Sequence, residues 1–137
     1  MLKLFEKADI KGFQYEGIEK SPLEFQYRNK MEFTFGNLTK EGEMTLGMHQ
    51  SGKFYNILPI EQCKIVDDDY NILLKTISDY CRRKELSFYK KMSHEGYLRY
   101  LVIRKSFRRN ELLVNIITTT QVEHDFSDLV DELLKLN

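Results

Sequence analysis

The spacing of the apolar residues changes twice along the chain, and this change limits the possible folds more than any other feature. In "YRNKMEFTFG" (27–36) apolar and charged residues alternate, which is typical of a strand with one buried face. From 67 to 84 the apolar residues recur every three or four positions, which is typical of a helix. Residues 97–105 and 111–119 return to a strand-like composition. Strands, a helix and more strands predict an α+β fold with a mainly antiparallel sheet packed with two or three helices.

The elements have recognisable limits in the sequence. We expect strands at 26–36, 43–50 and 54–58 to form a β-meander, and strands at 97–105 and 111–119 to form a hairpin across "SFRRN". We expect helices at 2–8, 67–84 and 126–136, the last two beginning with Asp67–Asp69 and Asp125 as N-terminal caps. With no repeat or Pro-rich linker, residues 1–137 are expected to form a single domain.

Asn29 is an exception on the apolar side of the first predicted strand. It lies between Arg28 and Lys30, where the chain would enter the sheet. A buried amide must be hydrogen-bonded, so we expect Asn29 to bind neighbouring backbone and fix the entry of the strand.

The positive charge is concentrated in one segment although the net charge of the chain is zero. Between Arg82 and Arg109 ten cations stand against two anions, Glu85 and Glu95. Such a segment can hold a phosphate backbone, because screening limits the reach of distant acids. The same charges can instead be neutralised by acidic neighbours in the fold, and the sequence alone leaves both interpretations open.

The common catalytic motifs are missing from this sequence. The seven glycines form neither a dinucleotide-binding fingerprint nor a phosphate loop. The three histidines are too far apart for the usual zinc spacings, and no nucleophile elbow is present. We therefore find no self-contained active site.

The two cysteines have different expected roles. Cys81 lies on the apolar side of the predicted helix and is expected in the core. Cys63 lies in "LPIEQCKI" between a strand and a helix, where it can be a ligand or a reactive thiol. One cysteine cannot hold a metal cluster, so a cluster would need thiolates from elsewhere.

An ordered set of segments resembles one family. "YRNKMEFTFG" (27–36), "LGMHQSGKFYNILPIEQC" (46–63) and "GYLRYLVIRKSFRRNELLVNIITT" (96–119) are similar to the central region of RNA uracil-5-methyltransferases of the TrmA/RumA type. The resemblance covers residues 13–137. It implies an S-adenosylmethionine-dependent enzyme that acts on tRNA or 23S rRNA, with this chain as its central domain. The RNA-binding TRAM domain and the catalytic Rossmann-like domain would then lie outside these residues.

The resemblance also implies roles for particular residues. In the family a cysteine at the position of Cys63 is the fourth ligand of a [4Fe–4S] cluster, while some members lack the cluster. The candidate RNA-binding residues are Arg28, Lys30, Arg99, Arg104, Arg108 and Arg109. Arg99 and Arg104 are five positions apart, so we expect them on opposite faces of their strand. Arg108 and Arg109 follow Phe107 at the hairpin tip, a combination that suits single-stranded RNA.

Two other functions remain open: a stand-alone RNA-binding module without catalysis, and an interaction domain whose basic segment balances its own acids. The expected partners are structured RNA and the TRAM and catalytic domains of the same chain; an oligomer of this part alone would be an artefact of excision. No membrane span or signal peptide is predicted, and two unpaired cysteines favour a reducing, cytoplasmic compartment.

Overall fold

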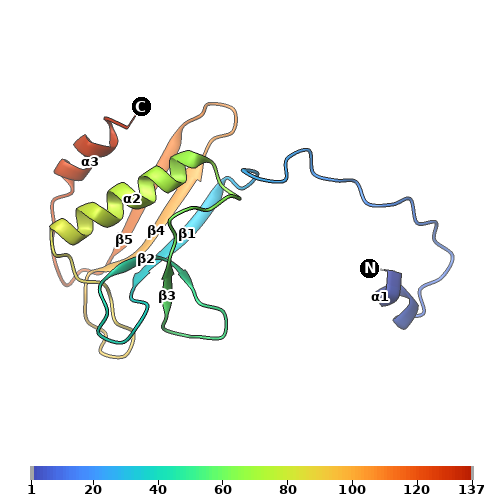
Figure 1. The fold of residues 1–137 in the computed structure, drawn as a ribbon, viewed down its shortest axis with the longest axis horizontal. Coiled ribbons are helices and arrows are strands. Elements are labelled where there is room, and N and C mark those ends of the chain that lie inside the picture. The colour runs from blue at the N-terminus through green and yellow to red at the C-terminus, as the bar shows by residue number, and fades with distance from the viewer. Residues whose placement is uncertain (1, 137) are drawn as a thin grey trace.

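The computed structural model describes residues 2–136 and contains one five-stranded sheet (Figure 1). The strands are β1 (Lys30–Gly36), β2 (Thr45–His49), β3 (Ile57–Pro59), β4 (Leu98–Lys105) and β5 (Leu112–Thr118). Their order across the sheet is β3-β2-β1-β4-β5, and every neighbouring pair is antiparallel. The predicted α+β fold, the meander and the hairpin are therefore confirmed.

Two strands of the meander are placed differently from the prediction. β1 begins at Lys30 rather than at 26, and β3 covers 57–59 rather than 54–58. Residues 26–28 run beside 64–65 instead, where the Arg28 N–H donates to the Ile65 carbonyl at 2.9 Å. Phe54 and Tyr55 lie exposed in the loop before β3. The predicted strands are too long at these points because aromatic residues favour a strand prediction even where the chain lies outside the sheet.

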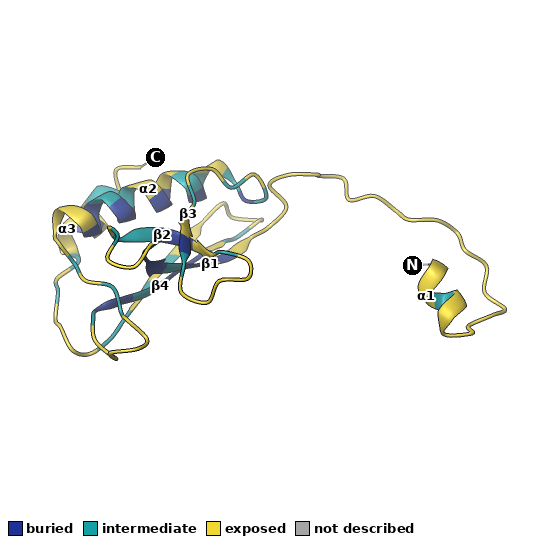
Figure 2. Ribbon diagram, turned by 60° about the horizontal axis from the view of Figure 1, so that its bottom comes forward, coloured by how far each residue is buried: buried dark blue, intermediate teal, exposed yellow. Residues whose placement is uncertain are grey.

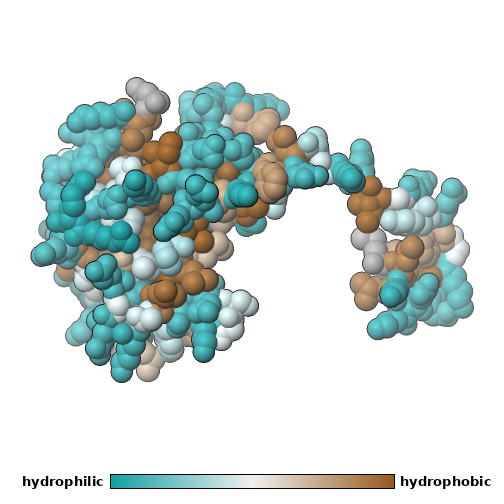
Figure 3. All heavy atoms as spheres, viewed as in Figure 1, coloured by the Kyte–Doolittle hydropathy of each residue, from teal (hydrophilic) through white to brown (hydrophobic). Residues whose placement is uncertain are grey.

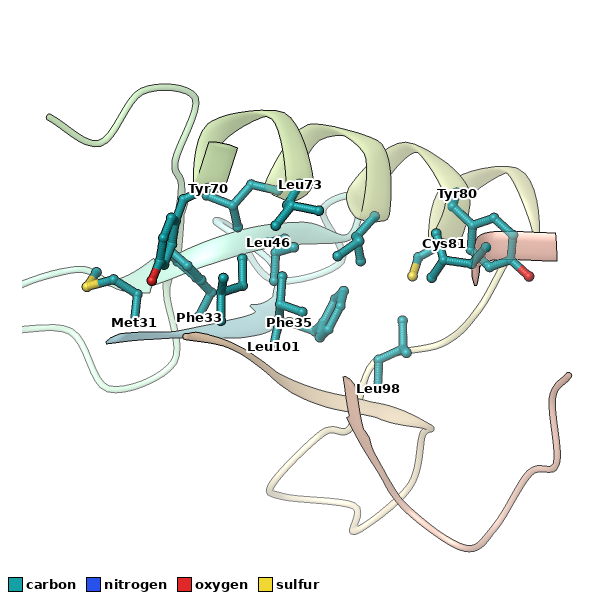
Figure 4. Packing of buried hydrophobic residues seen from close by; sticks show 14 of the residues in the cluster. Met31, Phe33, Phe35, Leu46, Tyr70, Leu73, Tyr80, Cys81, Leu98 and Leu101 are labelled. Atoms are coloured by element: carbon teal, nitrogen blue, oxygen red, sulfur yellow. The ribbon is translucent and has the colours of Figure 1, made fainter. Parts of the chain in front are cut away.

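Helix α2 (Asp68–Arg83) crosses one face of the sheet, as its periodicity predicts. Asp67 is the N-cap, and its carboxylate accepts the Asp69 N–H at 3.3 Å. In Figure 4 the helix directs its buried side chains at those of β1, β2 and β4. Apolar residues that recur every three or four positions along this helix are buried: Tyr70, Leu73, Leu74, Ile77 and Cys81. Each large apolar side chain in this core contributes roughly 1.5–3 kcal/mol by leaving water.

Helix α3 (Ser127–Leu133) packs beside α2 on the same side of the sheet, and no helix covers the other side among the described residues (Figure 2). Leu129 is buried, but the apolar side chains of Val130 and Leu134 are exposed. The N-cap is Phe126, one residue after the predicted Asp125. The Asp125 carboxylate still accepts the Ser127 N–H at 2.9 Å, so it satisfies one of the free donors of the first turn.

The predicted N-terminal helix is present as α1 (Leu2–Lys7), which has no buried residue. It lies apart from the sheet at the end of a long connection through residues 8–29 (Figure 1). Apolar side chains of this connection, among them Phe13 and Ile18, are exposed, and Figure 3 shows brown side chains on this part of the molecule. The core is therefore built from residue 31 onward.

Asn29 fixes the entry of β1 by a different group from the one expected. Its side chain is exposed and lies before the strand, so the expectation of a buried amide is wrong. Its backbone carbonyl accepts the Tyr70 hydroxyl at 2.7 Å and the Lys105 N–H at 2.9 Å. These two bonds attach the start of β1 to both α2 and β4.

Candidate RNA-binding surface

The register of the sheet determines which side chains face away from the helices. Met31 pairs with Ile103 and Phe33 with Leu101, and all four are buried beneath α2. The residues between them therefore point to the opposite side of the sheet. We call this side the open face; it carries Lys30, Glu32, Thr34, Tyr100, Val102, Arg104, Leu113, Asn115 and Ile117.

Four of the ten cations in the basic segment are neutralised by acids on the helical side. Arg83 and Lys84 form ion pairs with Glu132 and Asp128 of α3, at 2.6 and 2.7 Å. Arg82 lies 3.6 Å from Asp79 on its own helix. The fourth is Lys105, which binds the N-terminal end of α2. For these four residues the structure supports the interpretation of a self-balanced charge.

Lys105 is the most enclosed of these cations. Its ammonium group lies 2.8 Å from Asp67 and 2.6 Å from Asp69, and its side chain is 13% exposed. Burial by itself lowers the pKa of Lys105, but the hydrogen bonds to the two carboxylates outweigh burial and raise the pKa. The hydrogen bond from Lys105 holds the pKa of Asp67 below its usual value. Lys105 is therefore a structural cation that fastens β4 to α2.

The other six cations have no ion pair within residues 2–136. Arg104 lies on the open face directly opposite Lys30 of β1, and both side chains are exposed. Like charges in this position repel each other, so an anion between them would stabilise the pair. Arg28 lies next to them, and its Nε donates to the Lys30 carbonyl at 3.1 Å. Three predicted RNA-binding residues are thus brought together at one end of the open face.

Arg108 and Arg109 lie at the tip of the β4–β5 hairpin, beyond that same end of the sheet. Both are exposed, and the neighbouring Phe107 is 89% exposed. The turn is closed by the Asn110 N–H, which donates to the Ser106 carbonyl at 2.9 Å. The backbone therefore holds the tip while its charged and aromatic side chains stay in solvent.

Arg99 differs from its predicted position. A β-bulge lies between Leu98 and Tyr100, so the alternation of β4 is interrupted at this residue. The Arg99 guanidinium lies 4.8 Å from the ring centroid of Tyr89 and 5.5 Å from that of Tyr100, which belongs to the open face. Arg99 and Arg104 consequently lie on the same side of the sheet, and the expectation of opposite faces is wrong. Arg99 is partly buried and stacked, whereas Arg104 is exposed.

The two cysteines occupy the environments expected of them. Cys81 is buried, and burial raises the pKa of its thiol to about 12. Cys63 is partly buried and free, and its backbone N–H donates to the Asn71 side chain of α2 at 2.8 Å. Among residues 2–136 no group of three histidines, cysteines or acids is arranged to hold a metal ion. Cys63 is therefore not part of such a group within the described residues.

The structure also contains a hollow beside the sheet that the sequence does not reveal. It has a volume of about 570 Å³ and lies between the loops 37–41, 54–57 and 88–92. Its signal in the sequence is the mixture of aromatic residues and lysines in "SGKFYN" and "SFYKKM", which a count of charges alone overlooks. No single element contains the hollow, so periodicity could not reveal it.

Comparison with known proteins identifies the family to which the chain belongs. A scan against protein-family models finds no match. Curated RNA methyltransferases, uncharacterized in function, are 52% identical over 131 residues in Caldanaerobacter subterraneus and 48% identical over 137 residues in Clostridium acetobutylicum. These alignments cover 96% and 100% of this chain but only 29% and 30% of the relatives. The chain thus spans about three tenths of the length of the relatives it matches.

A solved structure has the same fold. The Pyrococcus abyssi tRNA (uracil-54, C5)-methyltransferase, in complex with S-adenosyl-L-homocysteine, superposes with a TM-score of 0.63 and 22% identity. The match covers 79% of this chain and 26% of that enzyme. Fold and sequence therefore both correspond to a portion of known RNA methyltransferases. The chain belongs to the RNA methyltransferase family that its sequence motifs indicated.

Proposed function

We propose that this chain is the RNA-binding central domain of an S-adenosylmethionine-dependent RNA uracil-5-methyltransferase that acts on tRNA or 23S rRNA. The observation that carries this proposal is the division of the cations. The four on the helical side have acidic partners, and the six on the open face and its margins have none within the described residues. In a homologue of RNA methyltransferases, exposed cations without partners fit a phosphate backbone.

Arg28, Lys30 and Arg104 form the phosphate-binding cluster of this proposal. Arg104 and Arg28 offer planar guanidinium groups that suit bidentate contacts, and Lys30 adds a point charge between them. Such contacts position RNA on the domain and carry no sequence information. Arg108 and Arg109 extend the cluster along the hairpin.

The chemical step would take place in the part of the enzyme outside these residues. S-adenosylmethionine supplies the methyl group in enzymes of this class, but the described residues contain no glycine-rich loop to hold it. The chain's own contribution is to bind RNA and to present it to the TRAM and catalytic domains. No helix within residues 2–136 has the length and apolar composition needed to cross a membrane. The free thiols of Cys63 and Cys81 support a cytoplasmic, reducing location.

Cys63 is proposed as one of four ligands of a [4Fe–4S] cluster in the whole enzyme. Its loop is fixed by Asn71, its thiol is free, and iron–sulfur clusters are held by cysteine thiolates. The other three thiolates would come from outside the described residues. In the complete protein we expect Cys63→Ser to lower the bound iron and Cys81→Ser to leave it unchanged. Equal iron in both variants would refute the role of Cys63.

Salt-dependent RNA binding tests the proposed function. We expect this chain to bind an unmodified tRNA transcript with an affinity that falls as salt rises, measured by fluorescence anisotropy. Lys30→Ala with Arg104→Ala should reduce the slope of log affinity against log salt by about 2, near one unit for each phosphate released. The matched control is Lys75→Ala with Lys135→Ala, two exposed lysines on α2 and near the C-terminus. Equal weakening in both variants would show that RNA responds to the total charge of the chain rather than to this cluster. No RNA binding at all would favour an interaction domain instead.

The enzymatic part of the proposal requires the complete protein. Methyl transfer to an RNA transcript should produce 5-methyluridine, detected by mass spectrometry of the digested RNA. Methylation at another base position would refute the uracil-5 assignment. RNA binding without any methylation would favour the stand-alone RNA-binding module.

A further inference from the structure

The hollow between the three loops has the dimensions of a ligand-binding site. Its volume of about 570 Å³ lies within the range of small-ligand pockets. The floor is Ile57, which lies against Gly36 so closely that a Cβ at Gly36 would overlap it. The walls come from loops that are far apart in the sequence, which Figure 1 shows gathered at one end of the sheet.

Two of the aromatic rings that line this hollow, Phe54 and Tyr55, remain largely exposed. Phe54 and Tyr55 meet edge to face, with ring centroids 5.0 Å apart, and Phe54 is 69% exposed. The Tyr55 hydroxyl lies 3.2 Å from the sulfur of Met92, so the loops 54–57 and 88–92 are in contact here. Exposed aromatic surface of this kind costs free energy in water, so a flat partner that covers the Phe54 ring would be favoured.

The opposite wall is held in place by neighbouring side chains. The guanidinium of Arg99 stacks on the Tyr89 ring at 4.8 Å, and the Tyr89 hydroxyl lies 2.8 Å from Nδ1 of His94. The loop that carries Tyr89 is anchored by Gln121, whose side chain binds the Gly96 N–H and the His94 carbonyl. The wall is therefore preorganised, and Arg99 acts as a positioning residue for Tyr89.

The rim of the hollow is positively charged. Lys40, Lys90 and Lys91 border it, against the single carboxylate of Glu41. The Lys91 ammonium lies over the Phe54 ring, 4.9 Å from its centroid, so a cation is held at one face of a ring that is still 69% exposed. An aromatic platform next to cations suits a nucleotide, because the base stacks while its phosphate binds the ammonium groups.

We propose that this hollow binds one unstacked base of single-stranded RNA, with Phe54 as the stacking platform and Lys91 on the adjoining phosphate. The proposal rests on the proposed RNA-binding function and adds a specific subsite to it. The basic cluster of Lys30 and Arg104 lies toward the other end of β4 from Arg99 and Tyr89. A strand of RNA that binds both sites therefore follows β4 along the open face.

Stacking and charge can be separated by experiment on this chain. The probe is a fluorescent oligouridine of about ten nucleotides, within the span of single-strand sites. We expect Phe54→Ala to weaken its binding roughly 5- to 100-fold, the effect of one unstacked base, with an unchanged salt slope. Lys91→Ala should instead reduce that slope by about 0.7. Tyr15→Ala and Lys135→Ala are the matched controls, one exposed aromatic residue and one exposed lysine away from the hollow.

Two further measurements locate the base. An oligomer of the same length without bases should bind the native chain and Phe54→Ala equally. With 4-thiouridine in the probe, ultraviolet crosslinks should map to the segments 54–55 or 88–89. The native chain could bind the probe with the expected salt dependence while Phe54→Ala leaves the affinity unchanged and the crosslinks map elsewhere. That result would overturn the subsite and leave the RNA-binding function intact. A native chain that binds neither the probe nor tRNA overturns both.

Discussion

The charged side chains on the two faces of the sheet differ in their partners. On the helical face, Lys105 lies between two carboxylates and Arg83 and Lys84 reach across to α3. On the open face, Lys30 and Arg104 stand opposite each other without an acidic partner in the described chain. The same residue types therefore contribute to folding on one side and remain available for an anion on the other. Their position in the fold, not their number, separates the two roles.

The largest expected difference concerns the hydrophobic side chains of the two faces. Phe33 is fully buried beneath α2, so Phe33→Ala should lower the free energy of unfolding by about 3–5 kcal/mol. Leu113 on the open face is 49% exposed, and Leu113→Ala should cost about 1 kcal/mol or less. Urea unfolding followed by circular dichroism measures both. Equal costs would show that the open face is covered in solution, for example by self-association.

A close approach between β1 and β3 gives the next effect. A side chain at Gly36 would overlap Ile57, which is 2% exposed and cannot move away freely. Gly36→Ala should therefore cost about 1–3 kcal/mol through overpacking. Combined with Ile57→Ala, the Gly36→Ala substitution should cost less than the sum of the two single changes, since its obstacle is gone. If the costs of the two single changes simply add in denaturant unfolding, contact with Ile57 is not the reason that Gly36→Ala destabilises the protein.

The ion pairs of Lys105 give a smaller effect with a characteristic pH dependence. Lys105→Met should cost about 1 kcal/mol at neutral pH, near the value of surface pairs, because Asp67 and Asp69 remain partly exposed. The pKa of Asp67 is lowered in the fold, so its contribution is present above the usual aspartate pKa of about 3.9 and disappears as the pH falls through the folded value. The raised pKa of Lys105 keeps the pair intact up to about pH 10.

The stability difference between the native chain and Lys105→Met should therefore be constant at neutral pH and shrink below about pH 4. Thermal unfolding at several pH values measures it. Lys75→Met, at an exposed lysine outside any ion pair of the described chain, serves as the control. A difference that persists at pH 3 would mean that packing of the Lys105 side chain, rather than its charge, stabilises the protein.

The sequence predicts local features of this fold well and long-range ones poorly. The helix from Asp68 to Arg83 is foreseen because its cap and its apolar stripe lie within the same segment. The neutralisation of Arg83 is not foreseen, because Glu132 lies 49 positions away and only the packing of α3 on α2 brings it near. Arg99 is assigned to the wrong side because one bulge interrupts the alternation. The hollow escapes notice because three separate loops form it.

Two doublets of adjacent cations give the smallest and most selective test. Arg83 and Lys84 have acidic partners on α3, whereas Arg108 and Arg109 at the hairpin tip have none in the described chain. Replacing Arg83 and Lys84 by alanine should lower the urea midpoint slightly and leave the salt slope of tRNA binding unchanged. Replacing Arg108 and Arg109 should leave the midpoint unchanged and reduce that slope, by up to about 1 for each phosphate that the variant no longer binds.

The opposite result would be a lower salt slope for the Arg83 and Lys84 variant and a lower urea midpoint for the Arg108 and Arg109 variant. Ion pairing within the fold would then not determine which cations bind RNA. If both doublets reduced the slope equally, RNA would be responding to the total charge of the chain, and the open face would have no special role.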